Sequence, residues 1–244
     1  MALNHECTCS KFNTDTVWNF TRQLKWLDKY LFGHKGFIAG GFAKQIFNEQ
    51  RVRDLDIFFE SREDFDAAVE WYGGTNAYGR LGPTSKEGDR IDEYYENDNV
   101  HAFEHTYKEK RVMIIELNKK IFGPPISIIE QFDFTIAKFA YALQQIQNTP
   151  GPDGNPWVDE NGFSYHYEGL AIYHPKYFEH LTLKRLVIDE AIPYPTSTYE
   201  RMFKYAKYGY FPCRETKIKM IKALREMPEE DVTKLANYYT DGID

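Results

Sequence analysis

The sequence predicts an α/β (α+β) protein, in which a small mixed sheet with flanking helices is followed by a mainly helical C-terminal domain. Short apolar strand patterns occur at 37–39, 52–60 and 111–117. The segments between them repeat apolar residues at the three- and four-residue spacing of a helix. Beyond residue 173 the patterns are helical only, which indicates a second domain of different character.

This spacing predicts the elements in chain order. Helices are expected at 15–32, 42–48, 61–71, 126–147, 175–188, 197–208 and 214–238. Strands are expected at 37–39, 52–60, 101–107, 111–117 and 163–173. Ser61, with acidic residues directly behind it, is typical of a helix N-cap. The strand at 111–117 is apolar on both faces, which is typical of the centre of a sheet.

Two segments lack these patterns. Residues 86–98 carry six acidic and two basic side chains, so we expect a mobile acidic loop that holds −4 of the net charge of −7. Residues 148–162 are rich in Pro, Gly, Asn and Asp. They form the expected linker between a domain at 1–147 and the mainly helical domain at 163–244.

Composition narrows the function classes. With 30 basic and 37 acidic residues, the chain is unsuited to coat nucleic acid without regard to sequence, so a polynucleotide would have to be held locally. Three cysteines suit a reducing compartment, and we expect a cytoplasmic protein. No apolar run approaches the roughly 18 residues of a membrane span, so no membrane partner is expected.

Two aspartates on one predicted strand are the first candidate site residues. Asp54 and Asp56 are two positions apart, so their carboxylates project from one face, about 7 Å apart at Cα. Such oxygen ligands suit Mg²⁺ or Mn²⁺ and a two-metal phosphoryl-transfer site. The alternative is a pair of solvated surface acids.

Two further acids stand in apolar surroundings. Glu116 lies on a strand that is otherwise apolar on both faces, where a carboxylate is costly unless a cation satisfies it. It could complete the metal site, or form a structural ion pair with Arg53 or Lys119. Asp133, in a segment expected to be helical, could ligate metal, bond a helix terminus or orient the loop behind the site.

A glycine pair offers a phosphate site. Gly40 and Gly41 lie between a short strand and a helix, which directs backbone N–H groups and the positive end of the helix at a ligand beyond the strand. Lys44, about one turn into that helix, could add a positive charge. A plain tight turn is the alternative.

Together these residues resemble a known family. Phe37-Ile38-Ala39-Gly40-Gly41, then Asp54-Leu55-Asp56-Ile57, then Ile115-Glu116-Leu117 are similar to the hG[GS]…Dh[DE]h…h[DE]h signature of the DNA polymerase beta-like nucleotidyltransferase superfamily. The signature covers about the first 145 residues, and small phage and bacterial nucleotidyltransferases are nearest. Phe132-Asp133-Phe134-Thr135 is similar to a segment of CCA-adding and poly(A) polymerase-like members, although the arginine pair and basic tail of that branch are missing.

The resemblance implies a function and roles for the residues. It implies a nucleotidyltransferase-type sheet and a two-metal enzyme that moves a nucleoside monophosphate from an NTP such as ATP to a hydroxyl or phosphate acceptor. Gly40 and Gly41 would hold the triphosphate, Asp54 and Asp56 the Mg²⁺ or Mn²⁺ ions, and Glu116 the third position. Lys44 and Asp133 join the nucleotide-binding candidates.

The acceptor stays open between RNA, including tRNA, and a small molecule. Two alternatives remain beside the interpretation as a general metal-dependent nucleotidyltransferase. One is a toxin-like nucleotidyltransferase that modifies tRNA or protein, and the other is a degenerate scaffold that binds nucleotide without catalysis.

Overall fold

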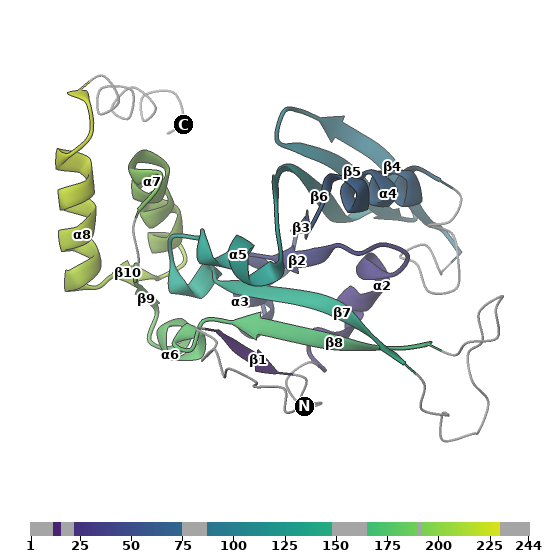
Figure 1. Ribbon diagram of the computed structural model, residues 1–244, viewed down its shortest axis with the longest axis horizontal. Helices are drawn as coiled ribbons and strands as arrows, with labels where there is room; N and C mark the ends of the chain where they lie inside the picture. The colour runs from purple at the N-terminus through teal and green to yellow at the C-terminus, as the bar shows by residue number, and fades with distance from the viewer. Residues whose placement is uncertain (1–11, 16–21, 75–86, 148–164, 190–191, 230–244) are drawn as a thin grey trace, which may run out of the picture. The chain divides into compact units, whose positions relative to one another are not determined.

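The computed structural model describes residues 12–15, 22–74, 87–147, 165–189 and 192–229 (Figure 1). These residues belong to two compact units. The first comprises Met1–Glu130 and Phe139–Pro175, and the second comprises Gln131–Lys138 and Lys176–Asp244. The expected linker at 148–162 lies outside the described residues. The division differs from the expected one, because the strand that follows the linker belongs to the first unit.

The first unit is built on one mixed sheet of eight strands, in the order β1-β8-β7-β2-β3-β6-β5-β4. Neighbouring strands are antiparallel, except that β3 and β6 are parallel. The predicted mixed sheet is therefore confirmed, but it is larger than the small sheet expected. Its strands are β1 Asn13–Asp15, β2 Phe37–Ala39, β3 Asp54–Phe59, β4 Asp89–Glu96, β5 Val100–Tyr107, β6 Lys110–Phe122, β7 Phe139–Gln147 and β8 Tyr165–Tyr173.

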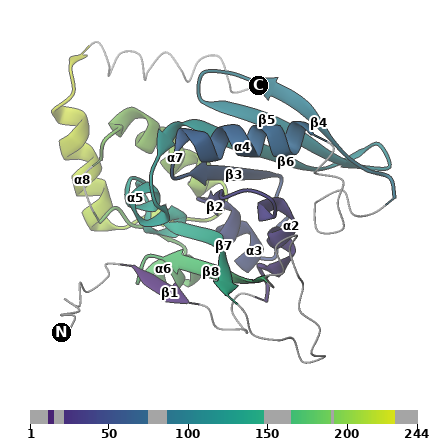
Figure 2. The ribbon, with the colours of Figure 1, turned by 45° about the vertical axis from the view of Figure 1, so that its right-hand side comes forward.

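Helices flank this sheet, as predicted. Helix α4 lies over the half of the sheet that β3, β6, β5 and β4 form (Figure 2). Its Phe65 packs edge-on against Phe59 of β3, and its Tyr72 stacks on Phe103 of β5. These contacts make the α4 side of the sheet the core of this half. Among the described residues, the helices of the unit are η1 Lys25–Leu27, α2 Asp28–Leu31, α3 Phe42–Phe47, α4 Arg62–Gly73 and α5 Pro125–Glu130.

Helix α4 begins where the sequence predicts it. The Oγ of Ser61 accepts a hydrogen bond from the Asp64 N–H at 3.1 Å, which is the predicted N-cap. None of the described helices is both long and apolar enough to span a membrane.

The helix expected at 15–32 can be compared with the structure at residue 15 and at residues 22–32. Asn13–Asp15 form strand β1, which pairs with β8, and residues 16–21 lie outside the described residues. Among residues 22–32, Lys25–Leu31 turn helically, as η1 followed by α2, so this part of the prediction is correct. Asp15 is instead the last residue of β1, which is held as a strand by its pairing with β8.

The long helix expected at 126–147 is wrong. Helix α5 ends at Glu130, a 3-10 turn follows at Thr135–Ala137, and Phe139–Gln147 form strand β7. The last segment pairs with β2 on one side and β8 on the other. A short apolar run between two partner strands forms a strand, although its residues also fit a helical spacing.

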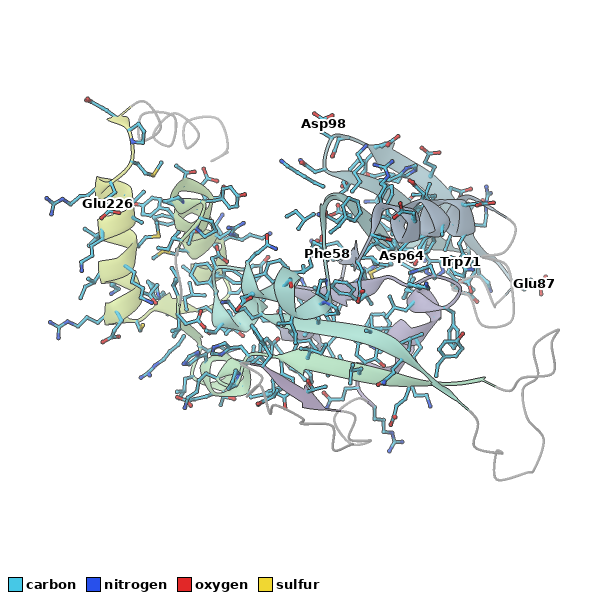
Figure 3. The ribbon with its side chains drawn as sticks, viewed as in Figure 1. Phe58, Asp64, Trp71, Glu87, Asp98 and Glu226 are labelled. Atoms are coloured by element: carbon cyan, nitrogen blue, oxygen red, sulfur yellow. The ribbon has the colours of Figure 1, made fainter. Side chains whose placement is uncertain are left out.

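The acidic loop expected at 86–98 is instead the edge strand β4, which pairs with β5. Ile91 is buried, whereas most of the other side chains of β4 are exposed. Glu87 and Asp98, labelled in Figure 3, lie beyond the two ends of the strand. Charged side chains are common on edge strands because they prevent pairing with another chain. Here they interrupt the alternation of apolar residues from which a strand is predicted.

The second unit contains three α-helices, one 3-10 helix and a two-stranded parallel sheet among its described residues. The helix expected at 175–188 is shorter than expected. It ends at Thr182 because Lys184 adopts a positive φ of 54° and Arg185–Leu186 pair as a strand. The elements are η3 Thr135–Ala137, α6 Tyr177–Thr182, β9 Arg185–Leu186, α7 Pro195–Ala206, β10 Phe211–Pro212 and α8 Arg214–Arg225.

His34, just before β2, makes stability depend on pH. Its Nε2–H donates to the Tyr30 carbonyl and its Nδ1 accepts from the Gly36 N–H, both at 3.0 Å. An imidazolium ion has no acceptor nitrogen. Burial lowers the pKa of His34 from the usual 6.5 to about 4.

We therefore expect the free energy of unfolding to decrease as the pH is lowered below the unfolded-state pKa of about 6.5. The stabilisation is complete above that pH and is lost as pH drops to the folded-state pKa, because the unfolded chain takes up the proton first. The expected contribution is about 1–3 kcal/mol. Urea denaturation of the wild type and His34→Gln, near neutral pH and near the folded-state pKa, measures it. Equal losses in both proteins would contradict the expectation.

Candidate active site

Three acidic side chains lie on one face of the sheet, where β3 and β6 pair in parallel. Asp54 and Asp56 are two positions apart on β3, so they share a face. Glu116 of β6 is the register partner of Asp56, and paired residues on neighbouring strands point to the same side. The parallel pairing thus places Glu116, which lies 60 positions along the chain from Asp56, directly beside it.

The opposite face of β3 is core. Leu55, Ile57 and Phe59 are completely buried, as the alternation predicted. Asp54 is exposed, whereas Asp56 and Glu116 are partly exposed. The carboxylates are therefore held by a rigid strand and are still open to a ligand.

The predicted glycine turn lies at the end of the strand next to β3. Strand β2 pairs antiparallel with β3, with Ile38 opposite Ile57. Because the two strands are antiparallel, the end of β2 lies toward the start of β3, where Asp54 is. Gly40 has a φ of 101°, which favours glycine, and Gly41 is the N-cap of α3.

The two glycine amides differ. The Gly40 N–H donates to the Phe139 carbonyl at 3.0 Å, so it is already used within the sheet. Among the described residues, the Gly41 N–H has no acceptor, as is usual at the start of a helix. Lys44 is only 4% exposed within α3. A phosphate at this turn would therefore be met by the Gly41 amide and the first turn of α3 rather than by both glycines.

Glu116 has a partner that the sequence did not reveal. The O–H of Tyr95, on β4, donates a hydrogen bond to the Glu116 Oε1. Lys119, one of the cations considered for Glu116, instead bonds the Oε1 of Glu96 at 2.7 Å. Glu116 is thus hydrogen-bonded to a neutral side chain, whereas Lys119 is bonded elsewhere.

The surroundings of Tyr95 keep its hydroxyl protonated. Burial, the hydrogen bond to Glu116 and the negative charges of Glu116 and Asp56 all raise the pKa of Tyr95 above its usual value. The hydrogen bond to Glu116 places Tyr95 beside the acids of β3 and β6. No local pattern in the sequence indicates this residue, because it lies in the segment expected to be a loop.

A second acidic cluster lies on the other face of the sheet. Glu93, Glu96 and His101 have ligand atoms within 4.8 Å of one another, the only such group of three found among the described residues. The His101 ring stacks on Phe103 at 4.9 Å, on the α4 side. Because Lys119 already bonds Glu96, this cluster is part of a surface charge network.

Asp54, Asp56 and Glu116 lie on the face of the sheet opposite α4, which we call the open face. They do not form such a compact group, since their ligand atoms are spread more widely. In two-metal sites the ions lie roughly 3.5–4 Å apart. Carboxylate oxygens are the ligands that Mg²⁺ and Mn²⁺ prefer. Asp54, Asp56 and Glu116 therefore fit a site for these cations.

Asp133 belongs to the second compact unit, not to the unit that carries the other acids. Its side chain is 7% exposed, and both oxygens have donors. Oδ2 accepts from the Arg201 Nε–H at 2.8 Å, and Oδ1 accepts from the Phe134 N–H at 2.9 Å. Of the roles left open by the sequence, these contacts favour a structural one within the second unit.

We expect Asp133→Ala to lower the free energy of unfolding by about 1–3 kcal/mol, because it leaves a buried N–H without its acceptor and Arg201 without its partner. Below its melting temperature the variant should keep the activity proposed below within a few-fold. Thermal unfolding and an activity assay at low temperature test both parts. Activity lost from a fully stable variant would instead indicate that Asp133 binds the ligand.

The fold and the site define a mixed α+β protein with a carboxylate-bearing sheet face. The chain belongs to the Gabija anti-defense 2 family, whose model matches residues 12–184. The matched region contains Gly41, all three acids of the open face and Tyr95. A comparison with curated proteins found no match.

Solved structures that are similar to the chain include two of CCA-adding enzymes and one of a tRNA nucleotidyltransferase, and the chain spans about half the length of each. The Thermotoga maritima CCA-adding enzyme complexed with tRNA is 13% identical over 88% of this chain and 46% of that one, with a TM-score of 0.46. A tRNA nucleotidyltransferase complexed with a primer tRNA and an incoming ATP analog is 14% identical over 78% and 47%, with a TM-score of 0.43. An apo CCA-adding enzyme is 12% identical over 88% and 46%, with a TM-score of 0.48.

Proposed function

We propose that the protein is a metal-dependent nucleotidyltransferase of the DNA polymerase beta-like superfamily. It transfers a nucleoside monophosphate from an NTP to a hydroxyl or phosphate acceptor and releases pyrophosphate. The observation that carries this proposal is the parallel register that sets Glu116 beside Asp56, with Asp54 on the same face. The Gly40-Gly41 turn at the end of the neighbouring strand supports it.

Each residue has a stated part in this proposal. Asp54, Asp56 and Glu116 hold the divalent cations, which when bound neutralise charge on the phosphates. The triphosphate lies against the Gly41 amide and the first turn of α3. Glu116 takes the proton of an acceptor hydroxyl through the oxygen that Tyr95 does not occupy. Lys44 stays a candidate for phosphate binding.

The bond changes balance without any further reactant. The acceptor oxygen forms a bond to the α-phosphorus, and the bond from that phosphorus to the oxygen bridging to the β-phosphate breaks. Pyrophosphate leaves with the bonding electrons, and the proton passes to Glu116. Positioning and charge neutralisation supply the catalysis in such transfers, which suits a site made of carboxylates and backbone amides on rigid elements.

The family name supplies a biological setting. We propose that nucleotidyl transfer is how this protein counters Gabija defence. The acceptor would then be an RNA, a protein or a small molecule present in a cell that carries that defence. This setting favours the modifying, toxin-like alternative over a housekeeping role in the host.

The test measures the transfer of a labelled nucleoside monophosphate to an acceptor. The protein is incubated with each NTP labelled at the α-phosphate and with Mg²⁺, alone, with total RNA, and with extract of Gabija-carrying cells. The proposal expects label to move to an acceptor, which mass spectrometry then identifies. NTP binding without transfer would point to a nucleotide-binding scaffold, and no NTP binding under any condition would overturn the proposal.

A further inference from the structure

Tyr95 reaches the acidic face because β4 is irregular. Up to Glu93, β4 pairs regularly with β5, with Glu93 opposite Phe103. One extra residue then shifts the register, so that Tyr95 and not Tyr94 lies opposite Ala102. Since a one-residue shift reverses the face on which a side chain lies, this bulge puts Tyr95 on the side of Glu116.

Four strands then present a single row of side chains. Ala102 of β5 is the register partner of Tyr95 on one side and of Glu116 on the other. Asp56 of β3 continues the row as the partner of Glu116. Bulges commonly re-aim a side chain beside an active site, and here the bulge completes a row that ends at the candidate metal ligands.

The small residue in this row leaves the space that the hydrogen bond needs. With strands about 4.8 Å apart, the backbones of Tyr95 and Glu116 are separated by roughly 10 Å. Ala102, which is completely buried, presents only a methyl group between them. The phenol of Tyr95 spans this gap and donates to the Glu116 Oε1.

On the basis of the proposed function, we propose that Tyr95 is a positioning residue for Glu116. Its O–H occupies Oε1 and fixes the orientation of the carboxylate, which leaves Oε2 for the cation and the acceptor hydroxyl. Because glutamate is long and flexible, removing this bond releases the carboxylate into several orientations. Partners that orient metal-binding carboxylates typically change metal affinity or activity by about 10–100-fold when they are lost.

The test removes one oxygen atom and measures cation binding directly. Mn²⁺ binding is followed by electron paramagnetic resonance for the wild type, Tyr95→Phe and the matched control Tyr94→Phe, which removes a hydroxyl from the neighbouring position. We expect Tyr95→Phe to bind Mn²⁺ about ten-fold more weakly, with the control unchanged. Thermal unfolding of each variant shows whether the sheet is intact.

A double-variant cycle shows whether Tyr95 acts through Glu116. In a Glu116→Gln background, Tyr95→Phe should cause no further loss of Mn²⁺ affinity. In turnover assays, Tyr95→Phe should raise the Mg²⁺ concentration for half-maximal rate and leave the KM for NTP unchanged at saturating Mg²⁺. A purely structural role of Tyr95 would not raise the Mg²⁺ requirement while leaving the KM for NTP unchanged.

The outcomes separate the two proposals. Wild-type affinity in Tyr95→Phe, or an equal loss in the Glu116→Gln background, would overturn the positioning role and leave the proposed function standing. An equal loss in Tyr94→Phe would show that the effect is not specific to the Tyr95 hydroxyl, and would also overturn it. If Asp56→Asn and Glu116→Gln bind Mn²⁺ as the wild type does, the proposed function fails and the positioning role fails with it.

Discussion

Asp56→Asn is expected to lower the rate of nucleotidyl transfer by about 10³-fold or more, equivalent to about 4 kcal/mol in the activation free energy. Asparagine keeps the shape of the side chain but removes the negative charge that would hold a cation beside Glu116. Pyrophosphate release at saturating NTP and Mg²⁺ measures the effect. The loss should appear in kcat, because the missing interaction acts on the reacting phosphate.

The same substitution should leave stability unchanged or raise it. Asp54, Asp56 and Glu116 are like charges on one face, and neighbouring like charges destabilise a sheet in the absence of cations. A matched control is Asp66→Asn on α4, where the carboxylate is exposed and its ion pair is with Arg62. A kcat within two- or three-fold of wild type in both variants would contradict the assignment of Asp56.

Phe59→Ala should produce the largest change in stability, a loss of about 3–5 kcal/mol in the free energy of unfolding. Phe59 is completely buried at the end of β3, 5.6 Å from the Phe65 ring and 6.0 Å from the His34 ring. Removing it leaves a cavity between the strand that carries the aspartates and α4.

Urea denaturation measures this loss, with Phe59→Leu as the graded control. Leucine fills most of the space, so it should destabilise clearly less than alanine does. Equal losses in the two variants, or a loss below about 1 kcal/mol for alanine, would show that the site collapses around the missing ring.

Local patterns predicted the part of the site that lies on one strand. The alternation along β3 determines which face Leu55 and Ile57 bury and therefore which face Asp54 and Asp56 share. Ser61 likewise acts within one turn of its helix. Such features depend on neighbours in the sequence, so the sequence alone is sufficient to predict them.

These local patterns do not predict which distant strands pair with each other. The apolar run at Phe139–Gln147 fits a helix and a strand equally, and only its partners β2 and β8 decide between them. The place of Glu116 was inferred from the cost of a carboxylate on an apolar strand, whereas its alignment with Asp56 is a matter of register. Tyr95 required both the edge strand and its bulge, and neither has a local signal.

A crystal structure with Mg²⁺ and an NTP analogue that cannot be cleaved tests the proposed metal site most directly. We expect cations on Asp54, Asp56 and Glu116, the triphosphate against the Gly41 amide, and Tyr95 still bonded to Glu116. An analogue bound elsewhere, or a triphosphate on this face with no cation on these carboxylates, would contradict it.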